Sequence, residues 1–495
     1  MERRTIPRHF RAAVDAGAGR TWLVTEDRAF TYGEALAEVE KAAAWLRAAG
    51  VQRGDRVLVT PRNDAAYLLS WLALMEVGAT QVPVNPSSSK AELDGFVAQV
   101  RPALVITDTA LAPSFERPAL VDDLYTATGD GQGPADLDER DPAVMIPTSG
   151  TTGRSKLVVQ THLAYVMAGE GFPYWLQLSA DDRLLTSLPL FHINAPAYSV
   201  LGSMAAGASL VLLPGFSAST FLDATRRFGA TQFNSIGAML EILMRQPPRD
   251  DDADNPVRLC YTGPSPARER HLEIEARFGW EVQCGYALSE TPYGLVWQHG
   301  TRPYGTLGSA RQHPVLGHVN DARVMDEGGP VGAGGTGELE LRNPAIMLGY
   351  FEMPEETSAV VVEGWLRTGD LVTDNGDGTY TFVGRKKQVI RRRGENLSPT
   401  EVEAVLDSHP DIAEAAVIGV PSDLSEEDIK AFIVPVAGRD VDVRAVRTYA
   451  AERLARFKVP RYYEVVDDLP HTATGRLAKH RLDASRNTTE VDTEA

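Results

Sequence analysis

Residues 143–156 read AVMIPTSGTTGRSK, an apolar stretch that runs into a loop of glycine and hydroxyl residues ending at Lys156. The apolar part predicts a buried strand. In the loop, backbone N–H groups and hydroxyls can wrap a polyphosphate while Lys156 neutralises its charge. The loop is not a Walker A loop, which has four residues between its first glycine and the Gly-Lys pair. A polar surface turn is the simpler alternative, but a turn does not require such a density of hydroxyls beside a lysine.

Strands and helices alternate around this loop. Residues 30–50 predict a helix, because apolar residues recur at helical spacing and Gly50 ends the pattern. A second helix is predicted over 64–77. Further strands are predicted at 55–60, 103–108, 183–190, 208–214 and 230–236. Strands that are apolar throughout are typical of parallel sheets buried on both faces, so the fold class of this part is α/β.

The pattern changes after about Pro314. Short alternating strands and glycine-rich turns predict a small antiparallel, barrel-like subdomain. Beyond Gly384, the pattern predicts a C-terminal α+β unit of ordinary domain size. Its predicted elements are a helix over 399–406, strands at 413–420 and 430–436, a helix over 443–455 and a strand at 462–466. We place the domain boundary between residues 1–386, an N-terminal acyl- and nucleotide-binding domain, and residues 387–495, a C-terminal domain.

Composition excludes several functional classes. Hydrophobic residues make up 43% of the chain and charged residues 23%, the balance of a globular protein. The net charge of -18 argues against nucleic acid as a partner. Cys260 and Cys284 are too few for a disulfide framework and are interpreted as core residues in a reducing compartment. Because no apolar run reaches membrane-spanning length, we expect a cytoplasmic protein without a membrane partner. The acidic run 250–254 is interpreted as a solvated loop.

The loop and a set of further motifs resemble one family. TSGTTGRSK resembles the phosphate-binding signature of the adenylate-forming superfamily of acyl-CoA synthetases, luciferases and nonribosomal peptide adenylation domains. The other matching segments follow in the family's order: FTYGEAL, VPVNP, PLFHINA, GYALSE, GELELRNPAIMLGY, GWLRTGD, GRKKQVIRRRGENLSPTEVE and LPHTATGR. The ordered set spans nearly the whole chain and is far more specific than any one motif.

The resemblance implies a site for an adenylate, a carboxylic acid and CoA. Residues implied to bind the nucleotide, either ATP or the AMP moiety of an acyl-adenylate, are Thr148, Ser149, Gly150, Thr151, Thr152, Gly153, Lys156, Tyr286, Ser289, Asp370 and Arg385. Asp370 is implied to accept from the ribose hydroxyls, with Arg385 as the second ribose contact. Glu290 is implied to hold Mg²⁺, a metal ion that prefers hard oxygen ligands. Residues implied to bind the acid are His192, Asn194, Gly263 and Ala287. Taken alone, His192 is more often a packed histidine, and Glu290 or Asp370 a residue of a turn.

The resemblance also implies that the C-terminal domain is mobile. Lys387 occupies the hinge, where a few backbone dihedrals allow the domain to swing between an adenylating and a thioester-forming pose. Gly394 is implied to leave room for the pantetheine arm of CoA in the second pose. Arg391, Arg392 and Arg393 are interpreted as a basic solvated face rather than as contacts to the CoA phosphates.

One departure from the family bears on catalysis. Arg476 stands where the family has its adenylating lysine, and a planar guanidinium does not reproduce one compact ammonium group. Milder departures are Ser155 for a proline, Leu157 for a glycine and Ala287 for a glycine. The pattern resembles the split ligases of platensimycin-type biosynthesis, in which a separate enzyme adenylates the acid and a second one forms the thioester. The alternative is that Arg476 or Lys479 supplies the missing charge.

The motifs therefore predict an acid–thiol ligase that converts an acyl-adenylate and CoA to an acyl-CoA and AMP, with weak or absent adenylation. Three alternatives stay open. The first is an ordinary ATP-dependent two-step ligase, and the second is transfer to a carrier protein or a non-thiol nucleophile. The third, from another class, is a non-catalytic nucleotide-binding regulatory protein. Neither the identity of the acid nor the oligomeric state follows from the motifs.

Overall fold

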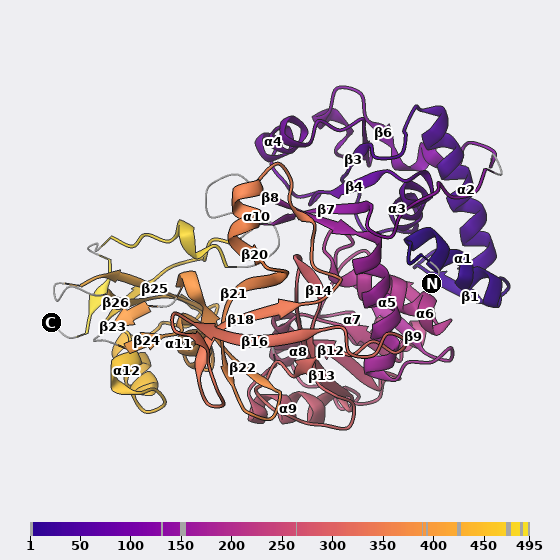
Figure 1. Cartoon of the computed structure of the whole chain (residues 1–495). Coiled ribbons are helices and arrows are strands. Elements are labelled where there is room, and N and C mark those ends of the chain that lie inside the picture. Colours follow the sequence, from indigo (N-terminus) through magenta and orange to yellow (C-terminus); the bar gives the residue numbers. More distant parts are fainter. Residues whose placement is uncertain are drawn as a thin grey trace. The chain divides into compact units, whose positions relative to one another are not determined.

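The computed structural model describes residues 3–129, 132–148, 155–263, 265–388, 390–392, 395–422, 427–471, 477–485 and 489–493. The chain divides into two compact units (Figure 1). The first unit consists of Met1–Arg323, Glu340–Arg367 and Asn375–Thr381. The second consists of Val324–Leu339, Thr368–Asp374 and Phe382–Ala495. Each unit is described separately below.

Two sheets form the framework of the first unit. The first sheet has the order β15 (Ser309–Ala310), β14 (Thr291–Val296), β13 (Glu281–Leu288), β12 (Leu259–Thr262), β11 (Gln232–Asn234), β9 (Arg183–Thr186), β10 (Ser209–Leu212), β1 (Thr21–Val24) and β2 (Ala29–Thr31). The second has the order β19 (Gly349–Tyr350), β8 (Lys156–Thr161), β7 (Pro142–Thr148), β4 (Thr80–Pro83), β3 (Arg56–Val59), β5 (Leu104–Thr107) and β6 (Ala119–Leu120). The central strands of both sheets pair in parallel, which confirms the α/β prediction.

Helices cover both faces of the first sheet (Figure 1). One core, shared with the second sheet, contains residues of α1 (Ile6–Gly17), α2 (Tyr32–Ala48), α3 (Ala65–Val77), α5 (His162–Leu176) and α6 (Leu201–Ala206). The other contains residues of α7 (Phe221–Phe228), α8 (Gly237–Arg245) and α9 (Arg268–Phe278). On β9, Leu184 enters the first core and the neighbouring Leu185 the second. Both faces are therefore buried, which is why these strands are apolar throughout.

The first unit contains further helices and one short strand. They are α4 (Lys90–Val100), α10 (Pro354–Val360), β20 (Val361–Val362), the short helices η1 (Ala112–Ser114) and η2 (Val121–Tyr125), and the π-helix η3 (Ala195–Val200). The predicted strand over 183–190 was too long, because β9 ends at Thr186. Two of the predicted helices begin at clear capping residues. Thr31 and Glu34 form a capping box at α2, and Asp64 caps α3, which ends at Gly78 in the left-handed conformation.

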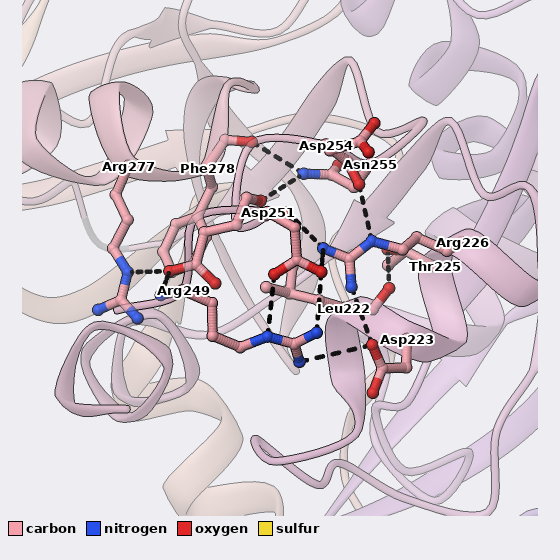
Figure 2. Close-up of polar contacts among 11 residues, drawn as sticks. Leu222, Asp223, Thr225, Arg226, Arg249, Asp251, Asp254, Asn255, Arg277 and Phe278 are labelled. Atoms are coloured by element: carbon pink, nitrogen blue, oxygen red, sulfur yellow. Dashed lines mark hydrogen bonds and ion pairs between the residues drawn. The ribbon is translucent and has the colours of Figure 1, made fainter. Parts of the chain in front are cut away.

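The acidic run 250–254 is held by arginines rather than simply solvated (Figure 2). Asp252 is buried and accepts a 2.8 Å hydrogen bond from Arg277, while Asp251 accepts from Arg249 at 2.9 Å. Arg226 donates to the backbone oxygen of Asp254 at 2.7 Å. The prediction of a solvated loop was therefore wrong for Asp252, because its partner Arg277 lies far along the chain in α9.

A third, antiparallel sheet is built from strands between residues 321 and 385. It has the order β17 (Gly329–Pro330), β16 (Asp321–Asp326), β18 (Thr336–Arg342), β21 (Trp365–Asp374) and β20, and β22 (Tyr380–Arg385) also pairs with β21. The expected antiparallel subdomain is confirmed by this sheet. Its strands β16, β18 and β21 contribute residues to both units.

The C-terminal part of the second unit has its own core, built around a sheet and two helices. The sheet has the order β25 (Ile412–Pro421), β26 (Glu427–Pro435), β27 (Tyr462–Val465) and β28 (Val491–Asp492). The other elements are the hairpin β23 (Ile390–Arg392) and β24 (Glu395–Leu397), helices α11 (Pro399–Asp407) and α12 (Val443–Ala451), and short helices η4 (Lys386–Gln388), η5 (Arg456–Lys458) and η6 (Lys479–Arg481). The predicted helix over 443–455 ends earlier, at Ala451.

Two expectations from composition can be compared with this fold. Cys260 and Cys284 are both buried, unpaired core residues, as predicted. Among the described residues, no helix is both long and apolar enough to span a bilayer.

Candidate active site

The lysine of the glycine- and hydroxyl-rich loop is linked to the predicted metal ligand through one tyrosine. Thr148 ends β7 and Lys156 begins β8, and the Thr148 hydroxyl donates to the Lys156 carbonyl at 3.2 Å. The Lys156 ammonium lies 4.6 Å from the ring centroid of Tyr350. The Tyr350 hydroxyl in turn donates a 2.9 Å hydrogen bond to Oε1 of Glu290. Ser149, Gly150, Thr151, Thr152 and Gly153 lie outside the described residues.

Strand pairing brings these side chains together. β19 pairs antiparallel with β8 and places Tyr350 opposite Val158. β8 also reaches the turn that carries Ser289, because the buried Gln160 amide donates to the Ser289 carbonyl at 2.6 Å. The backbone oxygen of Glu290 accepts from Met347 at 2.8 Å. Lys156 and Glu290 are therefore joined by contacts between segments that are far apart in the sequence.

The hairpin β13–β14 carries Tyr286, Ala287, Ser289 and Glu290, all of them half-buried. The pairing register shifts between Tyr286 and Leu288, on either side of Ala287. The polar side chains of this motif thus lie at a hairpin end that is anchored by β8.

Of the other predicted acid-binding residues, Gly263 packs against this hairpin, while His192 and Asn194 lie in the segment between β9 and η3. Gly263 follows β12, and a Cβ at this position would lie 2.4 Å from the Gly285 carbonyl oxygen. Asn194 accepts a 2.8 Å hydrogen bond from Asn234 of β11. His192 lies against Phe191, with ring centroids 4.6 Å apart. Close backbone packing against Gly285 is therefore sufficient to explain the glycine at position 263.

Glu290 fits a metal ion carried by a phosphate substrate. Among the described residues, no group of three or more His, Cys, Asp or Glu side chains is placed to hold a metal. Mg²⁺ does not need such a group, since it is commonly held by one or two carboxylates together with substrate phosphates and water. The hydrogen bond from Tyr350 fixes the orientation of the Glu290 carboxylate.

In the second unit, the two predicted ribose contacts form an ion pair. Asp370 lies on β21 with only 1% of its surface exposed, and Arg385 ends β22. Nε of Arg385 lies 2.6 Å from Oδ1 of Asp370. The Arg385 side chain is 47% exposed, so this pair joins a buried acceptor to a solvent-facing donor.

The C-terminal predictions have a mixed outcome. Gly394 and Arg476 lie outside the described residues, and Lys387 is described only as a backbone position in η4. Arg392 is 2% exposed; it donates to Asp428 at 2.9 Å and to the Val459 carbonyl. The prediction of a solvated face was therefore wrong for Arg392, because this side chain is part of the domain interior.

Lys479 is also engaged within the second unit. Its ammonium lies 2.5 Å from Oε1 of Glu403, and both side chains are nearly buried, at 13% and 12% exposure. Glu403 additionally accepts from the backbone N–H of Val417 at 2.7 Å. Burial raises the pKa of Glu403. Lys479 therefore has a structural partner of its own.

Two residues near the site were missed in the sequence. Tyr350 lies in a family-like motif, but only its pairing with β8 shows that it contacts Glu290. Arg311 donates to the Tyr286 carbonyl at 3.5 Å and is fully buried. A single arginine in the loop around 305–315 carries no signal that would distinguish it from a surface residue.

Comparison with known proteins identifies the family. The AMP-binding enzyme family matches residues 10–351, and the AMP-binding enzyme C-terminal domain matches residues 401–476. A crotonobetaine/carnitine–CoA ligase from Salmonella paratyphi C is 31% identical, with 92% of this chain and 93% of that protein covered.

Solved structures agree. ATP-bound MatB from Rhodopseudomonas palustris has a TM-score of 0.88 at 27% identity, covering 97% of this chain and 98% of that one. o-Succinylbenzoate CoA synthetase (MenE) from Bacillus subtilis, in complex with its acyl-adenylate intermediate, has a TM-score of 0.88 at 26% identity with the same coverage. The chain belongs to the AMP-binding enzyme family, and is an acid–thiol ligase of the acyl-CoA synthetase type within the adenylate-forming superfamily.

Proposed function

We propose that this ligase forms an acyl-CoA and AMP from an acyl-adenylate and CoA, and that its own adenylation step is weak because Arg476 replaces the adenylating lysine. The observation that carries the proposal is the ion pair between Lys479 and Glu403. Lys479 is the lysine nearest in sequence that could stand in for the missing one. Taking it from a nearly buried carboxylate would leave that carboxylate unpaired, which is costly.

The proposed second half-reaction assigns the following roles to the residues of the site. Asp370 and Arg385 are proposed to hold the ribose hydroxyls, and Tyr286 and Ser289 the adenine and α-phosphate. His192, Asn194, Gly263 and Ala287 are proposed to bind the acid. Lys387 is proposed as the hinge and Gly394 as the residue that admits the pantetheine arm. The boundary near Lys387 and the mobility of the C-terminal domain are part of the same proposal.

A second candidate is the ordinary two-step ligase, which is favoured by the link from Lys156 through Tyr350 to Glu290. Lys156 and an Mg²⁺ ion held by Glu290 would neutralise the phosphates of ATP, a task that an adenylate alone does not require. The relatives' names do not decide the acid. They include crotonobetaine and carnitine, which carry a trimethylammonium group, and o-succinylbenzoate, which is anionic.

The test compares the two half-reactions in the full-length protein. Acid-dependent ATP–pyrophosphate exchange measures adenylation, and thioester formation from synthetic acyl-adenylates measures the second step. We expect thioester formation with little exchange, and restored exchange in Arg476→Lys. A preorganised positive contact to the charge that develops in the transition state typically lowers the barrier by roughly 3 kcal/mol. Arg476→Lys should therefore raise the rate of exchange about a hundredfold. Lys479→Met is the matched control and should leave exchange unchanged.

Robust exchange by the unmodified protein would establish the two-step ligase and overturn a separate adenylating partner. Nucleotide binding without thioester formation from any adenylate in a broad panel would instead favour the regulatory reading. If an amine or a carrier protein is acylated faster than CoA, the acyl acceptor is not CoA, but the family assignment is unchanged.

A further inference from the structure

Arg311 is a fully buried cation beneath the hairpin that carries Tyr286. Its Nε donates to the Leu295 carbonyl at 3.0 Å, and one terminal nitrogen donates to the Tyr198 hydroxyl at 2.7 Å and the Pro292 carbonyl at 2.8 Å. The other terminal nitrogen donates to the Tyr261 hydroxyl and the Tyr286 carbonyl. A guanidinium has five N–H groups, so each of them is directed at an acceptor.

All of these acceptors are neutral. In the part of the chain that the structure describes, no Asp or Glu side chain forms an ion pair with Arg311; the Glu170 carboxylate pairs instead with His313 at 3.0 Å and with Arg4 at 2.9 Å. Burial raises the pKa of both Tyr198 and Tyr261, so the two phenols keep their protons at neutral pH. The positive charge of Arg311 is therefore solvated by dipoles and is not neutralised by a direct ion pair.

The aromatic faces around this charge are already occupied. The guanidinium carbon lies 4.5 Å from the ring centroid of Trp175, 5.0 Å from that of Tyr198 and 6.0 Å from that of Tyr261. Proteins recognise quaternary ammonium groups with cages of such aromatic faces. Here the protein's own arginine fills the cage.

The charge lies close to the residues proposed to bind the acid. Gly285 lies between Tyr261 and Gly263: a Cβ at Gly263 would lie 2.4 Å from the Gly285 carbonyl oxygen, and a Cβ at Gly285 would lie 2.3 Å from the Tyr261 hydroxyl. Tyr198 lies in η3, which begins directly after Asn194. The Tyr286 carbonyl, an acceptor for Arg311, immediately precedes Ala287.

We infer that Arg311 makes this site select acids whose acyl part carries no positive charge, that is, neutral or anionic acids rather than trimethylammonium acids. The inference rests on the proposed function, because it takes Asn194, Gly263 and Ala287 as the acid-binding residues. Two cations within a protein interior repel strongly because the dielectric constant is low. All N–H groups of Arg311 already donate to protein acceptors. Arg311 therefore acts on the substrate through the electrostatic field of its charge and not through a hydrogen bond.

The experiment uses acyl-adenylates in matched pairs, so it does not depend on the adenylation step. In each pair, one acid ends in a trimethylammonium group and the other in a tert-butyl group, which has the same shape without the charge. The pairs span alkanoates with two to five methylene groups and para-substituted benzoates. We expect kcat/KM for thioester formation to be at least about tenfold higher for the neutral member wherever either member reacts. Equal values would overturn the inference.

The variants assign the effect to the charge. Arg311→Gln should reduce the preference at least about threefold, and Arg311→Lys should retain it, because the ammonium keeps the charge. Arg277→Gln is the matched control: Arg277 is likewise held by backbone carbonyls, although it also pairs with the Asp252 carboxylate, and its contacts are to the 250–254 loop and α8. It should leave the preference unchanged.

The outcomes are distinguishable. If Arg311→Gln folds and keeps the full preference for the neutral adenylate, Arg311 is not the cause of that preference. If the Arg311 variants do not fold, the preference of the unmodified protein still decides whether a cationic acid is excluded. If no adenylate of any kind yields a thioester, the proposed function fails and the inference fails with it.

Discussion

The hydroxyl of Tyr350 donates a 2.9 Å hydrogen bond to Oε1 of Glu290, while the ring of the same tyrosine faces the Lys156 ammonium. One side chain thus positions both the proposed metal ligand and the proposed phosphate ligand. Removal of the hydroxyl should disturb the orientation of Glu290 but keep the contact between the ring and Lys156.

We therefore predict that Tyr350→Phe binds MgATP about tenfold more weakly, since a hydrogen bond to a charged group is worth roughly 1.5 kcal/mol. Isothermal titration calorimetry with MgATP measures the effect. Tyr174→Phe, at an exposed tyrosine of α5, is the control. An unchanged Kd for Tyr350→Phe would show that Glu290 does not depend on this contact.

The ion pair between Asp370 and Arg385 leads to a prediction for the nucleotide. Asp370→Asn should weaken AMP binding roughly 30-fold, because a buried charged acceptor is lost, at about 2 kcal/mol. The dideoxy analogue of AMP, which lacks both ribose hydroxyls, should bind to the variant and to the unmodified protein with similar affinity. Glu327→Gln, at an exposed position of the same unit, is the control. A uniform loss for both ligands would argue against a ribose contact.

The Lys479–Glu403 pair leads to a prediction for stability. Lys479→Met should lower the free energy of unfolding by about 3 kcal/mol, because it leaves a nearly buried carboxylate without its partner. Adding Glu403→Leu should recover most of the loss, since apolar replacements of both partners are often neutral. Urea unfolding of the full-length variants measures both effects. If the double variant is no more stable than the single one, the ion pair is not the cause.

A buried histidine should make stability depend on pH. Burial lowers the pKa of His162 from 6.5 to about 4. Because the unfolded chain takes up a proton below pH 6.5 and the folded chain does not, stability should be full above that pH and should fall as the pH drops to about 4. The difference corresponds to about 3 kcal/mol.

Urea unfolding at several pH values between 4 and 7.5 tests this dependence. In His162→Gln the stability should fall less steeply over the same range. His318→Gln, at an exposed histidine, should fall as steeply as the unmodified protein. Equal slopes for all three proteins would assign the pH dependence to other groups.

Substitution of Gly263 can distinguish a role in backbone packing from a role in binding the substrate. Gly263→Ala should lose about 1–3 kcal/mol of stability, because its Cβ would lie 2.4 Å from the backbone oxygen of Gly285. Gly215→Ala has open space around the new methyl group and should be neutral. Thermal unfolding without any substrate distinguishes the two. If Gly263→Ala is stable but loses selectivity among acids, the glycine acts mainly as part of the acid site.

The sequence by itself determined the family, the α/β class and the positions of most elements. The motifs occur in a set order, and hydrophobic periodicity and capping residues such as Thr31, Asp64 and Gly78 are local signals. Local signals could not show which side chains meet. Arg392 belongs to a basic run in the sequence, yet in the structure it is buried against Asp428. Asp252 belongs to an acidic run, yet it is buried against Arg277.

Only the tertiary structure decided that Tyr350 joins Lys156 to Glu290, that Lys479 is engaged by Glu403, and that Arg311 lies fully buried among aromatic rings. The physical reason is that each of these contacts is made between segments brought together by strand pairing or helix packing. Electrostatic energies depend on distance and burial in space, and neither quantity can be read from one segment of the chain.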